Sequence, residues 1–235
     1  MAITFFGVSS VPTDNGSNNT TATTITPPSS MSLGDLVVVH CTQRGTATWS
    51  VGVTGGQTWN SLGANNATTN VNEETFWARY NGTWGANPRF DSTAGTNTTV
   101  VMVVFRPTDN TYFWGANNIA DNNVSGTTTV GISGVTTINP STITLAIWSS
   151  TDDNTWGTLN GSGWSKTGLD AQYRNLSGQD SSSTFAYYIA TSIVSVPSVT
   201  QTQLTLGADA TATRRITFYE YIPSSVKSTF FAFFN

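Results

Sequence analysis

The sequence is poor in residues that carry charge or chemistry. Among its 235 residues there are 9 Lys and Arg, 13 Asp and Glu, one His and one Cys. Thr, Ser, Asn and Gly supply 110 residues instead, and their hydroxyl and amide groups form hydrogen bonds without titrating near neutral pH. The sequence therefore offers few general acids, general bases or metal ligands. It favours a structural or binding protein without a cofactor.

The charge pattern also narrows the class of partner. A net charge of −4 with only 9 basic residues leaves no basic stripe for phosphates, so we expect no nucleic-acid partner. No apolar run approaches the ~20 residues of a membrane helix, and residues 1–7 lack the basic and apolar segments of a secretory signal. Cys41 has no second cysteine to pair with. We expect a soluble protein made in a cytoplasm, with no membrane partner.

Aromatic and β-branched residues are abundant, and their pattern predicts strands. The sequence has 8 Trp, 12 Phe and 7 Tyr, which is unlike a disordered chain. Short runs of Val, Ile, Thr and aromatic residues alternate with Gly, Asn, Asp and Pro, and no helical stripe is present. The fold class expected is all-β, a two-sheet β-sandwich of jelly-roll-like form. The expected strands are 3–11, 20–26, 35–43, 46–53, 58–62, 74–80, 98–106, 111–117, 127–132, 142–149, 164–169, 183–192, 203–207 and 212–222.

The sequence repeats itself in order. Residues 36–41 resemble 143–148, 56–59 resemble 161–164, 74–80 resemble 183–189, and 98–107 resemble 212–223. Four ordered matches predict a duplicated β unit. We expect one domain over residues 1–223, with repeats at about 33–107 and 141–223, in which Val38 and Leu145 occupy equivalent buried positions. An aromatic docking tail, residues 224–235, follows.

Several segments carry a family resemblance. A Pro27-Pro28 turn precedes Gly-Asp-Leu-Val-Val-Val at 34–39, then Gly-x-x-Trp at 56–59 and Val-Val-Phe-Arg-Pro at 103–107. With this pattern run twice, the sequence resembles a β-sandwich family common in tailed bacteriophage genomes. The resemblance covers roughly residues 3–222. It implies a virion structural protein or an appended module of phage and extracellular proteins, and it brings no functional residues with it. We expect the protein to be made in the host cytoplasm and located in the virion.

The few His, Cys, Asp and Glu residues give only weak indications of a catalytic or metal site. His40 and Cys41 are neighbours in an expected strand, so their side chains point to opposite faces and cannot pair; we expect both to be packed. The carboxylate pairs 73–74 and 152–153 have the composition of a glycosidase site, but adjacent like charges in polar loops are more often solvated. The Asp/Asn segments 14–15, 121–123 and 152–154 contain oxygen ligands without the spacing of a calcium loop. Calcium binding there stays open, and we expect no catalytic or metal site.

The tryptophans divide into two groups. Five are expected in the core: Trp49, Trp59, Trp77, Trp148 and Trp164. Trp84, Trp114 and Trp156 lie among Gly, Asn and Thr residues. If exposed, these three rings offer stacking surfaces for a sugar. The alternative is that they plug sheet ends or contact a neighbouring subunit.

The C-terminal segment is the strongest signal for a partner. Phe230, Phe231, Phe233 and Phe234 lie beyond the repeated unit, and such a terminus is seldom left in water. It can fold back on its own sandwich or dock on another chain. The sequence thus predicts a non-enzymatic virion structural protein, capsid-decorating or head-associated, that binds copies of itself and other virion proteins. The alternative is a carbohydrate-binding adhesin or tail-fibre module that recognises host surface glycans.

Overall fold

The regular structure consists of strands alone in the part of the chain that is described. The computed structural model describes residues 2–11, 21–67, 71–94, 98–124, 127–152, 155–166, 171–173, 181–203 and 209–223. Over these ranges every element is a strand and each strand pair is antiparallel, and no helix could cross a membrane. The expected all-β class is therefore confirmed.

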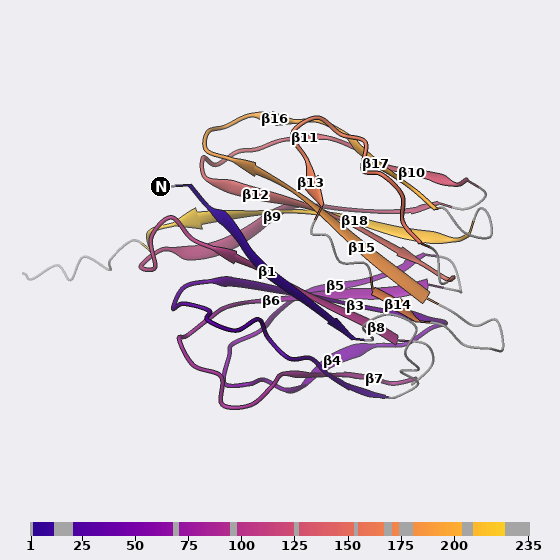
Figure 1. Ribbon diagram of the computed structural model, residues 1–235, viewed down its shortest axis with the longest axis horizontal. Helices are drawn as coiled ribbons and strands as arrows, with labels where there is room; N and C mark the ends of the chain where they lie inside the picture. The colour runs from indigo at the N-terminus through magenta and orange to yellow at the C-terminus, as the bar shows by residue number, and fades with distance from the viewer. Residues whose placement is uncertain are drawn as a thin grey trace, which may run out of the picture.

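Two large sheets form the centre of the molecule (Figure 1). The first has the order β1-β8-β3-β6-β5, and the second has the order β13-β15-β12-β18-β9, with β14 also paired to β15. The strands of the first sheet are β1 (Thr4–Val11), β3 (Leu36–Arg44), β5 (Asn60–Ala67), β6 (Val71–Arg79) and β8 (Thr98–Arg106). Those of the second are β9 (Phe113–Val124), β12 (Thr142–Ser150), β13 (Ser165–Lys166), β14 (Ala171–Tyr173), β15 (Ser181–Ala190) and β18 (Thr211–Tyr221). Each half of the chain thus builds its own sheet.

Three small sheets cover the outer faces of the large ones, above and below them in Figure 1. On the first half, β2 (Ala22–Thr24), β7 (Arg89–Ser92) and β4 (Trp49–Val53) pair in that order. On the second half, β10 (Thr129–Ile132) pairs with β17 (Val199–Thr202), and β11 (Val135–Thr136) pairs with β16 (Ser195–Val196). The molecule is a sandwich of more layers than the two that the sequence predicted. The reason is that the central strands bury both faces.

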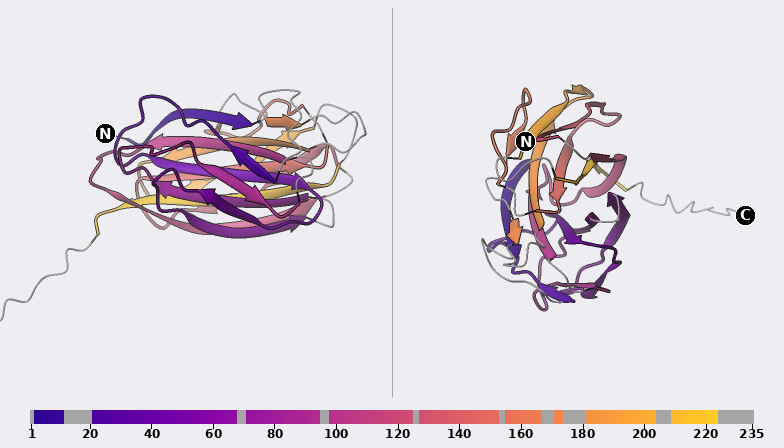
Figure 2. Two further views of the ribbon diagram at one scale, coloured as in Figure 1. Left: turned by 90° about the horizontal axis from the view of Figure 1, so that it is seen from below. Right: turned by 90° about the vertical axis from the view of Figure 1, so that its right-hand side faces the viewer.

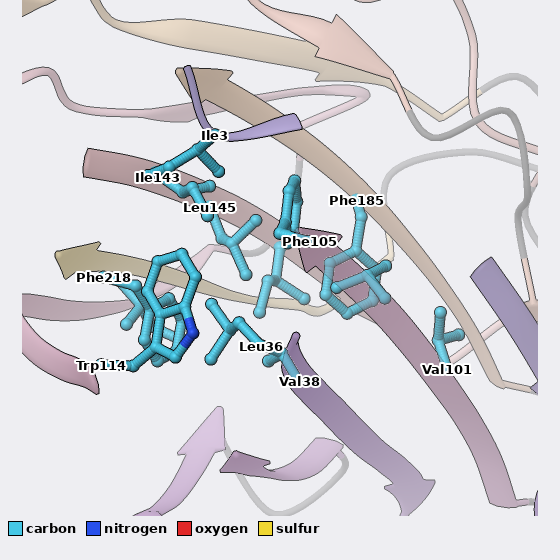
Figure 3. Packing of buried hydrophobic residues seen from close by; sticks show 13 residues of the cluster. Ile3, Leu36, Val38, Val101, Phe105, Trp114, Ile143, Leu145, Phe185 and Phe218 are labelled. Carbon is cyan, nitrogen blue, oxygen red and sulfur yellow. The ribbon is translucent and has the colours of Figure 1, made fainter. Parts of the chain in front are cut away.

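Three buried clusters fill the spaces between these layers. The largest lies between the two large sheets, where Leu36 and Val38 of the first sheet meet Ile143 and Leu145 of the second (Figure 3). The intervening residues of β3 point the other way, into a second cluster beneath β4 and β7. A third cluster, around Trp148, lies beneath the small sheets of the second half. Because successive side chains of a strand alternate between faces, a strand buried on both faces is a continuous apolar run.

The two halves have matching strand orders. Read from the edge, the first sheet runs β1-β8-β3-β6-β5 and the second runs β9-β18-β12-β15-β13. Val38 pairs with Val103, and Leu145 pairs with Ile216. Val38 and Leu145 are both 0% exposed, which confirms their predicted burial. The edge strands β1 and β9 also occupy matching places in the two orders. Both lie outside the predicted repeats, residues 33–107 and 141–223, so the similarity of the two sheets extends beyond those ranges. These facts support a duplicated unit, whose superposition stays a prediction, as does the jelly-roll-like form.

If Val38 and Leu145 are equivalent, the strand registers shift one of the repeat alignments, that of β6 with β15, by a single residue. The sequence match placed Trp77 opposite Ala186 in the alignment of β6 with β15. The strand registers differ from it, because Trp77 pairs with Val38 whereas Tyr187 pairs with Leu145. A shift of one residue moves every side chain to the other face of a sheet. The residue that a duplicated unit would place opposite Trp77 is therefore Tyr187.

Candidate functional site

The interface between the large sheets changes from apolar to polar along its length. On β3, the inward side chains Leu36 and Val38 are followed by His40 and Thr42, and all four are 0% exposed. The outward neighbour Cys41 belongs to the second cluster, so His40 and Cys41 do point to opposite faces, as expected. Burial and the nearby Glu74 raise the pKa of the Cys41 thiol.

The His40 ring is the centre of the polar half. Its Nδ1 lies 2.9 Å from Thr75 Oγ1, and its Nε2 lies 2.8 Å from Ser149 Oγ and 3.3 Å from Glu73 Oε2. Thr75 and Glu73 come from the first sheet and Ser149 from the second. Thr42 Oγ1 lies 3.0 Å from the same Ser149 hydroxyl. The ring therefore connects the two large sheets.

The hydrogen-bonded layer continues beyond His40. The Ser183 hydroxyl of the second sheet lies 2.9 Å from Thr42 Oγ1 and 3.1 Å from Thr99 Oγ1 of the first. Ser183 and Thr99 are both buried. These hydroxyls satisfy one another across the interface, where an unpaired polar group would cost free energy.

Arg214 supplies the positive charge of this layer. Its side chain is 0% exposed, and its Nε and Nη2 donate to Asp121 Oδ1 and Oδ2 at 2.7 and 2.9 Å. Its Nη1 donates to the carbonyl oxygen of Gly63 at 2.8 Å, and its Nε lies 4.0 Å from Glu73 Oε1. Burial alone would raise the pKa of Glu73, but attraction to His40 and Arg214 outweighs it and the pKa is lowered. The pKa of Arg214 is raised, because Asp121 and Glu73 outweigh its own burial.

The residue types Ser, His and Glu also occur in hydrolase triads, but the geometry here is different. In a triad, the serine and the carboxylate bind opposite nitrogens of the imidazole. Here Ser149 and Glu73 both lie against His40 Nε2. All three residues are 0% exposed, so a substrate has no access to the Ser149 hydroxyl in this structure. What the arrangement does is join two sheets.

The expectation for the first carboxylate pair was wrong. Glu73 and Glu74 lie within strand β6 and not in a polar loop, and they are 0% and 8% exposed. They point to opposite faces: Glu73 toward His40, and Glu74 toward Ser61, whose hydroxyl donates to it at 2.6 Å. The other oxygen of Glu73, Oε1, accepts a hydrogen bond from Asn65 Nδ2 at 3.0 Å, so each carboxylate accepts a hydrogen bond within the protein. Of the second pair, Asp153 lies outside the described residues.

The three proposed glycan-stacking rings do not form one exposed face. Trp114 and Trp156 are each 3% exposed, so the possible glycan-stacking role is wrong for both, and their burial fits the alternative that they plug the sheets. Trp114 packs between the large sheets and its Nε1 donates to the carbonyl oxygen of Gly34 at 2.8 Å. Trp84 is half-buried and stacks on Tyr80, with 5.3 Å between ring centroids. The five tryptophans expected in the core do lie in or against the buried clusters.

Side chains that could bind a metal ion are dispersed in the described part of the chain. Within the described ranges, no three His, Cys, Asp or Glu side chains come together to hold a metal ion. In the Asp/Asn segment 121–123, the Asp121 carboxylate is engaged by Arg214. The segment 14–15 and residues 153–154 lie outside the description.

The segments that carry the family resemblance are joined physically. Gly34 has a φ of +95°, and a Cβ there would lie 2.9 Å from the carbonyl oxygen of Asn110, so only glycine fits. The next residue, Asp35, is 0% exposed and accepts two hydrogen bonds from Arg106, both at 3.1 Å. These motif residues therefore fix the start of β3 against the end of β8. Their observed role is structural.

Residues 107–112 connect the two halves, and their backbone is held from both sides. Arg79 Nε donates to the Tyr112 carbonyl oxygen at 2.8 Å, and its Nη2 donates to the Asn110 carbonyl oxygen. From the second sheet, Glu220 accepts hydrogen bonds from the Thr108 amide at 2.6 Å and the Thr108 hydroxyl at 2.8 Å. The connection is thus anchored by one charged side chain from each large sheet.

Exposed apolar residues gather around this connection. Of seven exposed large apolar side chains in the described ranges, three lie together here and form a group that we call the apolar end. These are Phe113, Tyr221 and Ile222. Tyr221 and Ile222 line an open pocket of about 400 Å³, and its other lining residues are Thr108, Tyr112, Pro140, Ser141, Thr191 and Glu220. The Phe113 and Tyr221 ring centroids are 6.2 Å apart.

Hydrogen bonds also hold together the two loops that carry Ile138 and Ile193. The Thr137 amide donates to the Val194 carbonyl oxygen at 2.9 Å, and the Val194 amide donates to the Thr137 hydroxyl at 3.0 Å. The predicted docking residues Phe230, Phe231, Phe233 and Phe234 lie outside the described residues. Their segment begins at residue 224, directly beyond Ile222 and Pro223.

The fold and these sites define an all-β sandwich protein with a sealed polar interior and one apolar end. No family model, curated protein or solved structure matches this chain significantly. Its assignment to a functional class therefore rests on its own residues and geometry.

Proposed function

We propose that this protein is a non-enzymatic structural subunit of a bacteriophage-like virion, a capsid-decorating or head-associated protein that self-associates and docks on a larger assembly. One observation carries the proposal: the exposed side chains of Phe113, Tyr221 and Ile222 lie together at the end of β18, directly before the Phe-rich segment. An apolar surface of this kind is typical of an interaction site. The residues best suited to catalysis, His40, Glu73 and Ser149, are sealed between the sheets instead.

The carbohydrate-binding alternative has less support. It relied on three exposed rings, and two of these, Trp114 and Trp156, are buried. The remaining ring, Trp84, is partly covered by Tyr80. We therefore favour a protein partner.

The proposal is tested by locating the protein in particles. Virions purified from the source of this gene are imaged by electron cryomicroscopy, and the sandwich is fitted into the map. The expected result is density for the sandwich on the outer surface of the head. If purified particles lack the protein altogether, the proposal is wrong.

A truncated protein supplies the second measurement. Deletion of residues 230–235 removes the four Phe and leaves the described strands intact. We expect the truncated protein to unfold at an unchanged temperature but to lose particle binding. Binding equal to that of the full chain would show that the tail takes no part in docking.

A further inference from the structure

We propose that the apolar end is the receptor for the C-terminal segment, residues 224–235, of a second copy of this chain. This inference rests on the proposed function and names the partner of its docking segment. The sequence left open whether the segment folds back or binds another chain, and it gave no receptor for it.

The chemistry of the two surfaces is complementary. The segment offers four aromatic side chains within five residues, Phe230 to Phe234. The apolar end offers the Phe113 and Tyr221 rings and the exposed side chain of Ile222 beside an open pocket of about 400 Å³. The pocket is open to solvent, so a phenyl ring can enter it and contact Tyr221 and Ile222.

The receptor is held in place before binding. Arg79, which anchors the connection between the halves, also lies over the Phe113 ring, with its Cζ 4.7 Å from the ring centroid. Glu220, adjacent to Tyr221, is fixed by hydrogen bonds from Thr108 and from the Ser141 hydroxyl at 2.6 Å. A surface that is already ordered loses less conformational entropy when a ligand binds.

The direction of β18 favours exchange between copies. Figures 1 and 2 show β18 running along the long axis and ending at one end of the molecule, so that at Tyr221 the chain heads away from the sandwich. A segment that continued in the direction of β18 would lead away from its own copy. The 12 residues from 224 to 235 span up to about 40 Å when extended, which is enough to reach a neighbour.

The C-terminal segment and the apolar end lie at the same end of each copy. This position decides whether the exchange gives a closed dimer or an open filament. When two copies meet end to end about a two-fold axis, each segment reaches the other copy's receptor and both receptors are filled. No segment or receptor is then left free to bind a third copy. We therefore expect a dimer and not an open filament.

The experiment uses three variants of the full chain. The receptor variant carries Ile222→Asp, at a position 71% exposed, so its fold is expected to persist. The tail variant carries Phe231→Ser and Phe234→Ser. The control is Ile119→Asp, at another exposed apolar position, 43% exposed, on β9. Light scattering after size exclusion gives the mass, and thermal unfolding reports the fold.

We expect the wild type and the control to be dimers, and the receptor and tail variants to be monomers with unchanged unfolding temperatures. Each apolar side chain removed from the interface should weaken the dimer at least about tenfold. Mixing the two variants should give a heterodimer held by one tail in one receptor. The tail variant supplies the intact receptor, and the receptor variant supplies the intact tail.

Two outcomes overturn the inference while leaving the proposed function in place. In the first, the receptor variant dimerises like the wild type although the tail variant does not, which places the receptor elsewhere. In the second, the wild type is a monomer that still binds particles through its tail. A full chain that neither dimerises nor occurs on particles overturns both proposals.

Discussion

Replacement of Arg214 by Met tests whether the polar half of the sheet interface holds the sandwich together. The guanidinium is fully buried, pairs with Asp121 through two hydrogen bonds and lies 4.0 Å from the Glu73 carboxylate. Met has a similar length and no charge, so the substitution removes the cation without opening a large cavity. Glu73 then keeps His40 as its neighbour but loses its nearest guanidinium.

The expected cost follows from these contacts. Breaking a buried ion pair by removing one partner costs about 3–5 kcal/mol, because the remaining charge stays buried without compensation. The side chain of Asp121 is 32% exposed, so water can solvate its carboxylate once Arg214 is gone. The loss of unfolding free energy should therefore lie near the lower end of this range. We expect the free energy of unfolding to fall by about 3 kcal/mol. The double variant with Glu73→Gln should recover part of this loss, since the uncompensated carboxylate is gone.

The measurement is urea unfolding followed by tryptophan fluorescence, and the neighbouring arginine is the matched control. Arg215 points to the opposite face and donates to the carbonyl oxygens of Ser133 and Gly134 at 2.7 and 2.9 Å. Arg215→Met should cost only about 1 kcal/mol, as expected for hydrogen bonds at a partly exposed position. Equal effects of the two substitutions would refute the idea that the buried charge pairs of Arg214 stabilise the interface.

Three further predictions concern stability and activity. Val38→Asp or Leu145→Asp places an unpaired charge between the sheets and should cost several kcal/mol, measured by chemical unfolding; a loss below about 1 kcal/mol would contradict the described core. The folded-state pKa of Glu73 is lowered, so its stabilisation exists above the ordinary value of 4.5 and is lost as the pH falls through the lowered pKa. Unfolding free energy should therefore drop on acidification, and less so in Glu73→Gln; parallel pH profiles would contradict this. Cleavage of a broad polysaccharide panel should be undetectable; cleavage abolished by Glu74→Gln or Asp153→Asn would disprove the non-enzymatic proposal.

The strands were predictable because their apolar runs and turn residues are local signals. The predicted strand 98–106 coincides with β8 (Thr98–Arg106), and 142–149 misses β12 by one residue. The short outer strands β7, β11, β16 and β17 were missed, and so was β14 at the edge of the second large sheet. Strands of two to four residues are too short for a period to be recognised. Of the predicted strand 203–207, Gln203 forms an isolated bridge with Trp156, and the rest lies outside the described residues.

The sealed polar layer was not predicted, although one signal for it was present. His40 and Thr42 share the face of Leu36 and Val38 because they lie two and four residues further along one strand. Which residues meet them depends on how two sheets about 100 residues apart in sequence face each other, and no local pattern contains that information. The same limit applies to Trp114 and Trp156, whose Gly-rich neighbours suggested loops. Burial there is decided by tertiary contacts.

The position of β18 has a mechanical consequence for any load applied through the C-terminal segment. β18 is hydrogen-bonded on both sides, to β12 over residues 211–219 and to β9 over residues 211–221. Hydrogen bonds of an antiparallel ladder are perpendicular to the strands, so a pull along β18 loads both ladders in shear. Under that load the bonds must break together, whereas a strand peeled from a sheet edge releases them one after another. A particle held through this segment would thus be tethered by a strand that resists extraction, and force on the tail would be shared across the second large sheet.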